Sequence, residues 1–189
     1  MGDRPDDKAI DEDVRGPGFQ VKARDGHVLV LGIGNLLNTD EGVGIHAVRA
    51  LQARRAQARD GIHLVDGGTL GLNLLPLVEQ ATHLLLLDCV DAGKPGGTLV
   101  ELTKEEIPLY TGLKMSQHQT TFQEVMGLAA VRGLLPEQLH LIGVQPVSLD
   151  IGTELSPQVS AVLPEMIDRA ESLLEMWAAA IAGGVARNV

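Results

Sequence analysis

The chain has 189 residues, of which 44% are hydrophobic and 2% aromatic, and its formal net charge is −10. That length suits one domain with a single sizeable core. The acidic balance would repel phosphate backbones and anionic membranes, and the scarcity of aromatic rings removes the stacking surfaces that bind single-stranded nucleic acid, so we expect no nucleic acid and no membrane as partner.

The chain opens on a polar segment and then turns apolar. Residues 1–26 mix acids, bases, proline and glycine without an apolar period, which predicts a mobile arm. An apolar, β-rich run over 27–32 predicts a first strand that is buried on both faces. Apolar residues then recur at near-helical spacing from Glu41 to about Arg55, which predicts the first helix.

Strands and helices alternate through the rest of the chain. Further strands are predicted at 62–66, 83–88, 98–102 and 139–144, the third of them as a hairpin-like edge partner after a Gly- and Pro-rich turn. Further helices are predicted at 72–80, 116–133 and 156–183. Ser116 and Gln119 have capping-box spacing, Ser156 precedes a proline at the first helical position, and Pro164 should bend the last helix.

This alternation predicts the fold class. We expect a single α/β domain over residues 27–183, with a mainly parallel, twisted, five-stranded sheet, helices on both faces and a short tail at 184–189. In such folds, sites form at the carboxyl ends of the strands. Cys89 is the one cysteine and no charged-then-apolar leader opens the chain, so we expect a cytoplasmic protein without disulfides. We also expect a monomer.

The loop after the first strand carries the first candidate site residues. Gly32-Ile33-Gly34 begins like a dinucleotide-binding fingerprint, but the third glycine would fall on Leu37. Asp40 and Glu41 then stand where the helix starts, and their charges would repel a pyrophosphate but suit a cation. A structural alternative is that Asn38 and Glu41 form a capping box.

Two more candidates lie further along the chain. Asp88 ends a run of leucines, so its carboxylate should emerge at the carboxyl edge of a central strand, unless it caps a following turn, as Asp91 could. His118 falls in the first turn of a predicted helix, whose dipole favours a neutral, ligating imidazole. Two carboxylates and one imidazole suit nickel, zinc or iron.

Several motifs resemble those of hydrogenase maturation proteases. The opening Gly-x-Gly-Asn-x-Leu-x-x-Asp-Glu-Gly-x-Gly, Gly32 to Gly44 here, is the most specific of them. Other similar segments follow in family order: Val65-Asp66-Gly67-Gly68-Thr69, Leu87-Asp88, Lys114-Met115-Ser116-Gln117-His118-Gln119, Gly143-Val144-Gln145-Pro146 and Leu155-Ser156-Pro157. The resemblance covers about residues 27–180; it departs at Gln117, where proline is expected, and in the longer N-terminal arm.

The resemblance implies a hydrolase, an endopeptidase that removes the C-terminal extension of the nickel-loaded large-subunit precursor of a nickel-iron hydrogenase. It implies that Glu41, Asp88 and His118 recognise nickel in the substrate, without a permanent metal of the enzyme. Asp66 becomes a secondary, substrate-binding candidate. The peptidase would be aspartic-type or metal-assisted, with Asp88 or Asp40 as the base that activates water and Glu41 beside it.

Three other functions compete with this interpretation. A cysteine peptidase would pair Cys89 with His118, although Asp88 disfavours the thiolate and Cys89 should point to the opposite face. A non-enzymatic nickel carrier or chaperone for hydrogenase assembly would use the same three ligands and cut nothing. A nucleotide-binding oxidoreductase would rest on the partial glycine motif alone.

Overall fold

The protein is built around a five-stranded sheet in the order β2-β1-β3-β5-β4. This computed structural model describes residues 27–56, 61–107 and 117–185, and the side chains of 117–121 and 184–185 lie outside the described part. The strands are β1 (Val28–Ile33), β2 (Ile62–Gly68), β3 (His83–Cys89), β4 (Leu99–Thr103) and β5 (Gln138–Val144). The first three and β5 run parallel, whereas β4 is antiparallel, which confirms the predicted α/β sheet.

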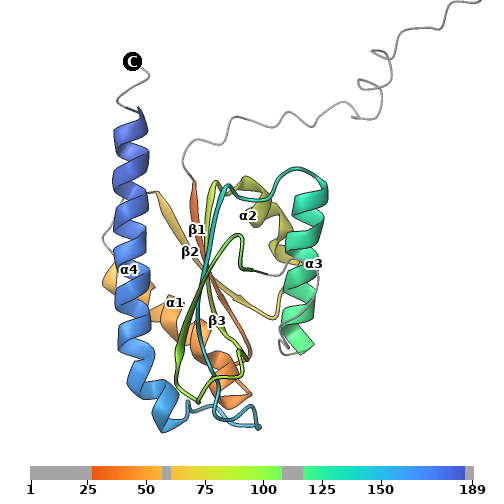
Figure 1. Ribbon diagram of the computed structural model, residues 1–189, viewed down its shortest axis with the longest axis vertical. Helices are drawn as coiled ribbons and strands as arrows, with labels where there is room; N and C mark the ends of the chain where they lie inside the picture. Colours follow the sequence, from red (N-terminus) through yellow and green to blue (C-terminus); the bar gives the residue numbers. More distant parts are fainter. Residues whose placement is uncertain (1–26, 57–60, 108–116, 186–189) are drawn as a thin grey trace, which may run out of the picture.

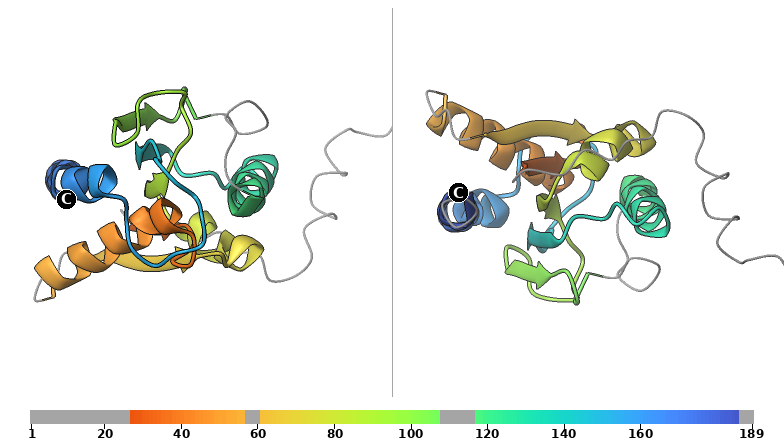
Figure 2. Two further views of the ribbon diagram at one scale, coloured as in Figure 1. Left: turned by 90° about the horizontal axis from the view of Figure 1, so that it is seen from below. Right: turned by 90° about the horizontal axis from the view of Figure 1, so that it is seen from above.

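Helices cover both faces of the sheet (Figures 1 and 2). On one face lie α1 (Val43–Arg54) and α4 (Pro157–Val185), and on the other lie α2 (Leu75–Gln80) and α3 (Gln117–Val131). Two short 3-10 helices, η1 (Thr39–Gly42) and η2 (Gly71–Leu74), precede α1 and α2. The helix predicted to begin at Glu41 therefore starts with a 3-10 turn that contains this residue.

Alternating side chains of the central strands pack on opposite helical layers. In β1, Val28 and Val30 belong to the core under α1 and α4, whereas Leu29 and Leu31 belong to the core under α2 and α3. All residues of β1 are buried. This burial explains why the sequence reads as a continuous apolar run instead of an alternating one.

The predicted pairing of the fourth strand is partly wrong. β4 is an edge strand, as expected, but it is no hairpin partner of β3, because β1 and β5 already occupy both sides of that strand. Instead β4 pairs antiparallel with β5, with Leu99 opposite Val144. The connection after β3 therefore crosses over β5 before the chain turns back.

The long helix α4 closes the fold as predicted, with Ser156 at its start. The Ser156 hydroxyl accepts a hydrogen bond from the Val159 amide at 3.4 Å. Pro164 lies inside the helix, whose first turns are inclined to the rest (Figure 1). Residues 1–26 and the predicted Ser116 cap lie outside the described residues. In the described part of the chain, no helix has the length and apolar character to span a membrane.

Candidate active site

The acidic turn between β1 and α1 is held by direct backbone packing. Gly34 has φ +139°, and a Cβ at this position would lie 1.8 Å from the Glu41 carbonyl oxygen. That oxygen also accepts a hydrogen bond from the Asn35 amide at 3.2 Å. Only glycine fits such an approach. The second glycine of the motif, Gly34, therefore positions Glu41. This backbone contact explains the glycine without a bound phosphate.

The Glu41 carboxylate is 4% exposed and takes part in no capping box. Asn38, the predicted partner, uses its side chain elsewhere: Nδ2 donates to the Leu149 carbonyl at 3.1 Å, and Oδ1 accepts from Asn35 at 2.6 Å. Within the described residues, no donor reaches the Glu41 carboxylate. The structural alternative for Glu41 is thus not realised.

Asp88 lies on the central strand β3, beside the acidic turn. Its side chain is 3% exposed, and its Oδ1 accepts the Cys89 amide at 2.7 Å. A Cβ at Gly44 would lie 2.1 Å from the carbonyl oxygen of Leu87, so the first turn of α1 rests on β3 one residue before Asp88. η1 and β3 are in contact. The fold therefore places η1, which carries Glu41, against β3, which carries Asp88, at the carboxyl edge of the sheet.

Asp40 is fully buried and serves as an acceptor for the loop between β5 and α4. Its Oδ2 accepts the amides of Val147 at 2.9 Å and Ser148 at 3.0 Å, and its Oδ1 accepts the Ser156 amide at 2.7 Å. Both oxygens are thus engaged by backbone donors. Sequence reasoning missed this role, because the partners lie 107 to 116 residues away in the chain.

His118 is the second residue of α3, and its side chain lies outside the described residues. α3 covers the sheet face to which Leu84 and Leu86 point, and in Figure 1 it begins near the edge where β3 ends. Alternation along β3 directs Asp88 to this same face. In the described part no group of three potential ligands occurs. The predicted set of three ligands, Glu41, Asp88 and His118, therefore stays a prediction.

Other histidines lie at the opposite edge of the sheet, where their rings contact other rings. His27 stacks on His63 with ring centroids 4.3 Å apart, and His83 meets the edge of Trp177 at 5.1 Å. Burial lowers the pKa of His27 and of His83, so both rings favour the neutral form.

Cys89 points to the sheet face opposite that of Asp88, into the core under α1 and α4. Burial raises the pKa of its thiol well above the ordinary value, and the carboxylates of Asp88, Asp40, Glu41 and Asp91 raise it further. A protonated, buried thiol is a poor nucleophile. Because α3 covers the other face of the sheet, the predicted alternative of a pair between Cys89 and His118 gains no support.

Asp66, the secondary candidate, lies near the end of β2. Its Oδ2 accepts hydrogen bonds from Arg49 of α1 at 2.8 and 3.1 Å. Both side chains are partly exposed, with relative values of 33% for Asp66 and 54% for Arg49. Asp66 is therefore one half of a partly exposed ion pair with α1, and such a pair adds little stability.

Gln145 organises the loop after β3 and was missed as an individual residue. It is 7% exposed; its Oε1 accepts the amides of Ala92 at 2.8 Å and Lys94 at 3.1 Å, and its Nε2 donates to Asp91 at 3.1 Å. The signal was its place in the segment Gly143–Pro146, which resembles the family. Gln145 fixes the chain that leaves Asp88.

A family model, related sequences and solved structures all indicate the same protein family. The family model described as hydrogenase maturation protease matches residues 45–173. The hydrogenase expression/formation protein HupD of Thiocapsa roseopersicina is 48% identical over 81% of this chain and 70% of its own length. The hydrogenase 2 maturation protease of Escherichia coli is 36% identical over 75% of this chain and 87% of its own.

A solved structure, the hydrogenase maturating endopeptidase HybD from E. coli, superposes with a TM-score of 0.72 at 32% identity and covers 79% of this chain and 93% of that one. The match to the family model includes β3, which carries Asp88, and begins just after the turn that carries Glu41. The chain belongs to the hydrogenase maturation protease family.

Proposed function

We propose that the chain is an endopeptidase that removes the C-terminal extension from the nickel-loaded large-subunit precursor of a nickel-iron hydrogenase. Membership of the family makes it a hydrolase of the peptidase class. The single observation that carries the finer proposal is that two buried acids, Glu41 of η1 and Asp88 of β3, lie on contacting elements at the carboxyl edge of the sheet. This edge is where α/β folds place their sites.

In this proposal, Glu41, Asp88 and His118 bind the nickel that the precursor carries. Two carboxylates and an imidazole are donors that nickel accepts. Buried carboxylates close together repel each other, and a divalent cation between them would relieve that repulsion. The nickel belongs to the substrate, so the enzyme needs no metal of its own.

Asp88 is the carboxylate that we assign to water activation. It would accept a proton from the attacking water, the oxygen would add to the scissile carbonyl carbon, and the proton would pass to the departing amine nitrogen. The Cys89 amide holds the Asp88 carboxylate in place. Asp40 is assigned a positioning role, because its oxygens are engaged by the backbone donors of the β5–α4 loop.

The test incubates the purified chain with precursor that is nickel-loaded or nickel-free and follows release of the C-terminal peptide by mass spectrometry. We expect release from the loaded form alone. Glu41→Gln, Asp88→Asn and His118→Ala should abolish release while unfolding stays cooperative, and Glu175→Gln, which changes an exposed acid of α4, should behave like the wild type. Nickel uptake by the chain without peptide release would instead identify a carrier and sink the peptidase proposal.

Asp66 stays a secondary substrate-binding prediction. Its pairing with Arg49 supports a role in shaping the rim of the site. Asp66→Asn should raise KM for the precursor and leave kcat near the wild-type value, since Asp66 pairs with Arg49 and is not one of the proposed reacting groups. An unchanged KM would remove Asp66 from the site.

A further inference from the structure

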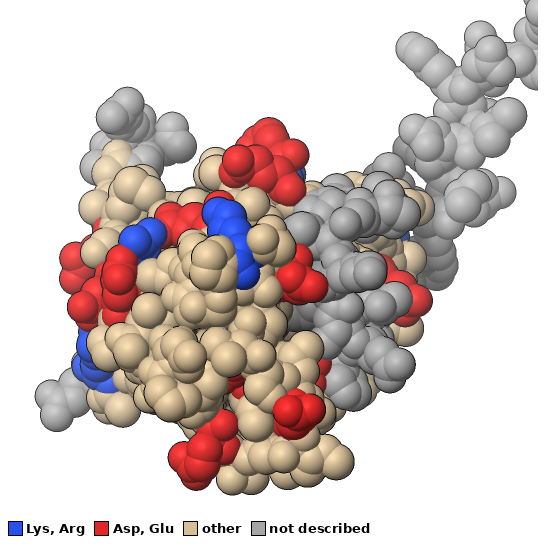
Figure 3. Space-filling view, turned by 60° about the horizontal axis from the view of Figure 1, so that its bottom comes forward, with Lys and Arg blue, Asp and Glu red and all other residues tan. Residues whose placement is uncertain are grey.

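Apolar side chains project into solvent from the loops that frame the acidic turn. We call this set the docking platform; its members and their exposed fractions are Leu37 (63%), Val147 (47%), Leu149 (44%) and Ile151 (93%). Figure 3, which brings this end of the molecule forward, shows a broad area without charged residues. Such grouped exposed apolar side chains at one place mark interaction sites more often than isolated ones do.

The platform is held rigid from beneath. Hydrogen bonds join the loop between β1 and η1 to the loop between β5 and α4. The Gly152 amide donates to the Leu37 carbonyl at 2.9 Å, and the Gly152 carbonyl accepts the Thr39 amide at 2.8 Å. Thr39 has φ +40°, an unfavourable value for a branched residue, and its hydroxyl donates to the Ser148 carbonyl at 2.7 Å. The apolar side chains therefore cannot turn inward without breaking these bonds, and a preformed surface loses little entropy on binding.

The platform is continuous with the acidic site. The Val147 amide donates to the carboxylate of Asp40, which is the neighbour of Glu41 in the chain. Asn38, three residues before Glu41, donates to the carbonyl of Leu149. A polypeptide that is cut beside Glu41 and Asp88 must run over the surface next to them, so its residues that flank the cut come within reach of the platform.

The charges around the platform restrict its partner. Asp150 and Glu154 belong to the same loop and are exposed. In the described part of this loop, residues 145–156, no basic side chain balances them. An acidic segment would be repelled here, whereas an apolar segment with basic neighbours would be attracted.

We propose that the docking platform binds apolar side chains of the precursor's C-terminal extension next to the scissile bond. The inference rests on the proposed function, and it names the chemistry of the substrate segment: extended, apolar, and flanked by basic residues in preference to acidic ones. The docking platform then provides most of the specificity for the C-terminal extension, whereas Glu41, Asp88 and His118 recognise the nickel.

The experiment measures kcat and KM for tail release from nickel-loaded precursor, and Kd for the same precursor in an Asp88→Asn background, where nothing is cut. Ile151→Ser and Leu37→Ser are the test variants, and both should fold because these side chains are exposed. Val131→Ser is the matched control, since Val131 is 77% exposed at the far end of α3. We expect KM and Kd to rise about tenfold per test variant, with kcat unchanged and the control like the wild type.

Each outcome decides the proposal. Unchanged Kd in both test variants overturns it, and so does a wild-type chain that does not bind the precursor. A chain that binds but never cuts contradicts the proposed peptidase function, while the Kd comparison still decides the platform. Sedimentation of the wild type as a dimer that Ile151→Ser converts to a monomer would assign the platform to a contact between two copies and overturn the inference. A synthetic peptide of the extension should inhibit cleavage by the wild type about tenfold more strongly than by Ile151→Ser.

Discussion

Replacing Asp40 with asparagine distinguishes a positioning residue from a catalytic base. In the structure, Oδ2 accepts two amides and Oδ1 accepts one, at 2.7 to 3.0 Å. An asparagine oxygen can keep the pair at Val147 and Ser148, but its NH₂ group then faces the Ser156 amide, donor against donor. One buried unsatisfied amide costs about 1–3 kcal/mol and the loss of charge weakens the other two bonds, so we expect the free energy of unfolding to fall by about 2–4 kcal/mol.

The assay pairs urea unfolding with processing of the nickel-loaded precursor. Because the Asp40 clamp holds the β5–α4 loop, Asp40→Asn should raise KM and lower kcat less than tenfold at a temperature where the variant is folded, roughly within the range of a displaced positioning group. Glu175→Gln, at an exposed acid of α4, is the control and should match the wild type. The opposite result would identify Asp40 as the general base. In that case the free energy of unfolding would change by less than about 0.5 kcal/mol, while kcat would fall more than about a hundredfold.

Three other predictions concern the close approach at Gly44, the buried thiol of Cys89 and the partly buried ring of His83. Gly44→Ala should destabilise the protein by about 1–3 kcal/mol and reduce processing, because the new Cβ would lie 2.1 Å from a β3 carbonyl; Gly183→Ala, with nothing within 4 Å, should instead gain up to about 1 kcal/mol, and thermal unfolding compares the two. Cys89→Ala should keep the wild-type kcat, since burial raises the pKa of this thiol and keeps it protonated; an inactive variant that is still folded would restore the thiol mechanism. Burial lowers the pKa of His83 below its ordinary value of 6.5, so the unfolded state takes up the proton first, and stability should fall as the pH drops through 6.5 and level off below the folded pKa. Melting temperatures between about pH 7.5 and pH 5.5 should therefore decrease in the wild type and decrease less in His83→Gln; an equal slope would contradict the assignment.

The sheet could be predicted because local patterns and core packing agree. The run of leucines in β3 and the apolar residues of β1 are buried on both faces, so each strand reads as a continuous apolar segment bounded by polar or glycine residues. The glycine motif indicates that the backbone is closely approached at Gly34. Only the structure shows that the Glu41 carbonyl occupies the place of a Gly34 side chain. Local chemistry thus gave the location of the acidic turn.

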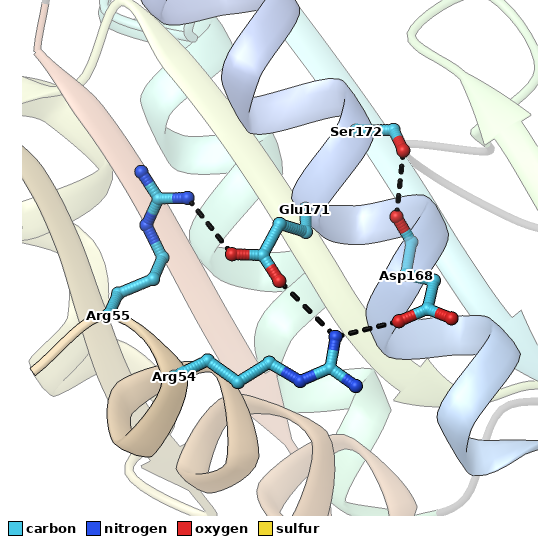
Figure 4. A network of polar contacts seen from close by, with 5 residues as sticks. All are labelled: Arg54, Arg55, Asp168, Glu171 and Ser172. Carbon is cyan, nitrogen blue, oxygen red and sulfur yellow. Dashed lines mark hydrogen bonds and ion pairs between the residues drawn. The ribbon is translucent and has the colours of Figure 1, made fainter.

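Contacts between distant segments could not be predicted in this way. Arg54, in the last turn of α1, and Arg55, which follows it, are both joined to α4 (Figure 4). Arg54 reaches Asp168 at 2.6 Å and Glu171 at 3.2 Å, and Arg55 reaches Glu171 at 3.3 Å. The pairing of β4 with β5 likewise depends on which sheet edge is open, which no local pattern records.

The long-range bonds also explain how an acidic turn can be buried. The charge of Asp40 is compensated by three backbone amides, and Glu41, 4% exposed, has no comparable donor among the described residues. Holding Glu41 near Asp88 in a poorly solvated place therefore costs free energy, which the clamp at Asp40 and the packing of α1 on β3 offset. A divalent cation delivered by the substrate would remove that cost on binding, and a precursor without metal would leave it in full. In the proposed function, discrimination between loaded and empty precursor would then follow from the buried charge of the enzyme itself.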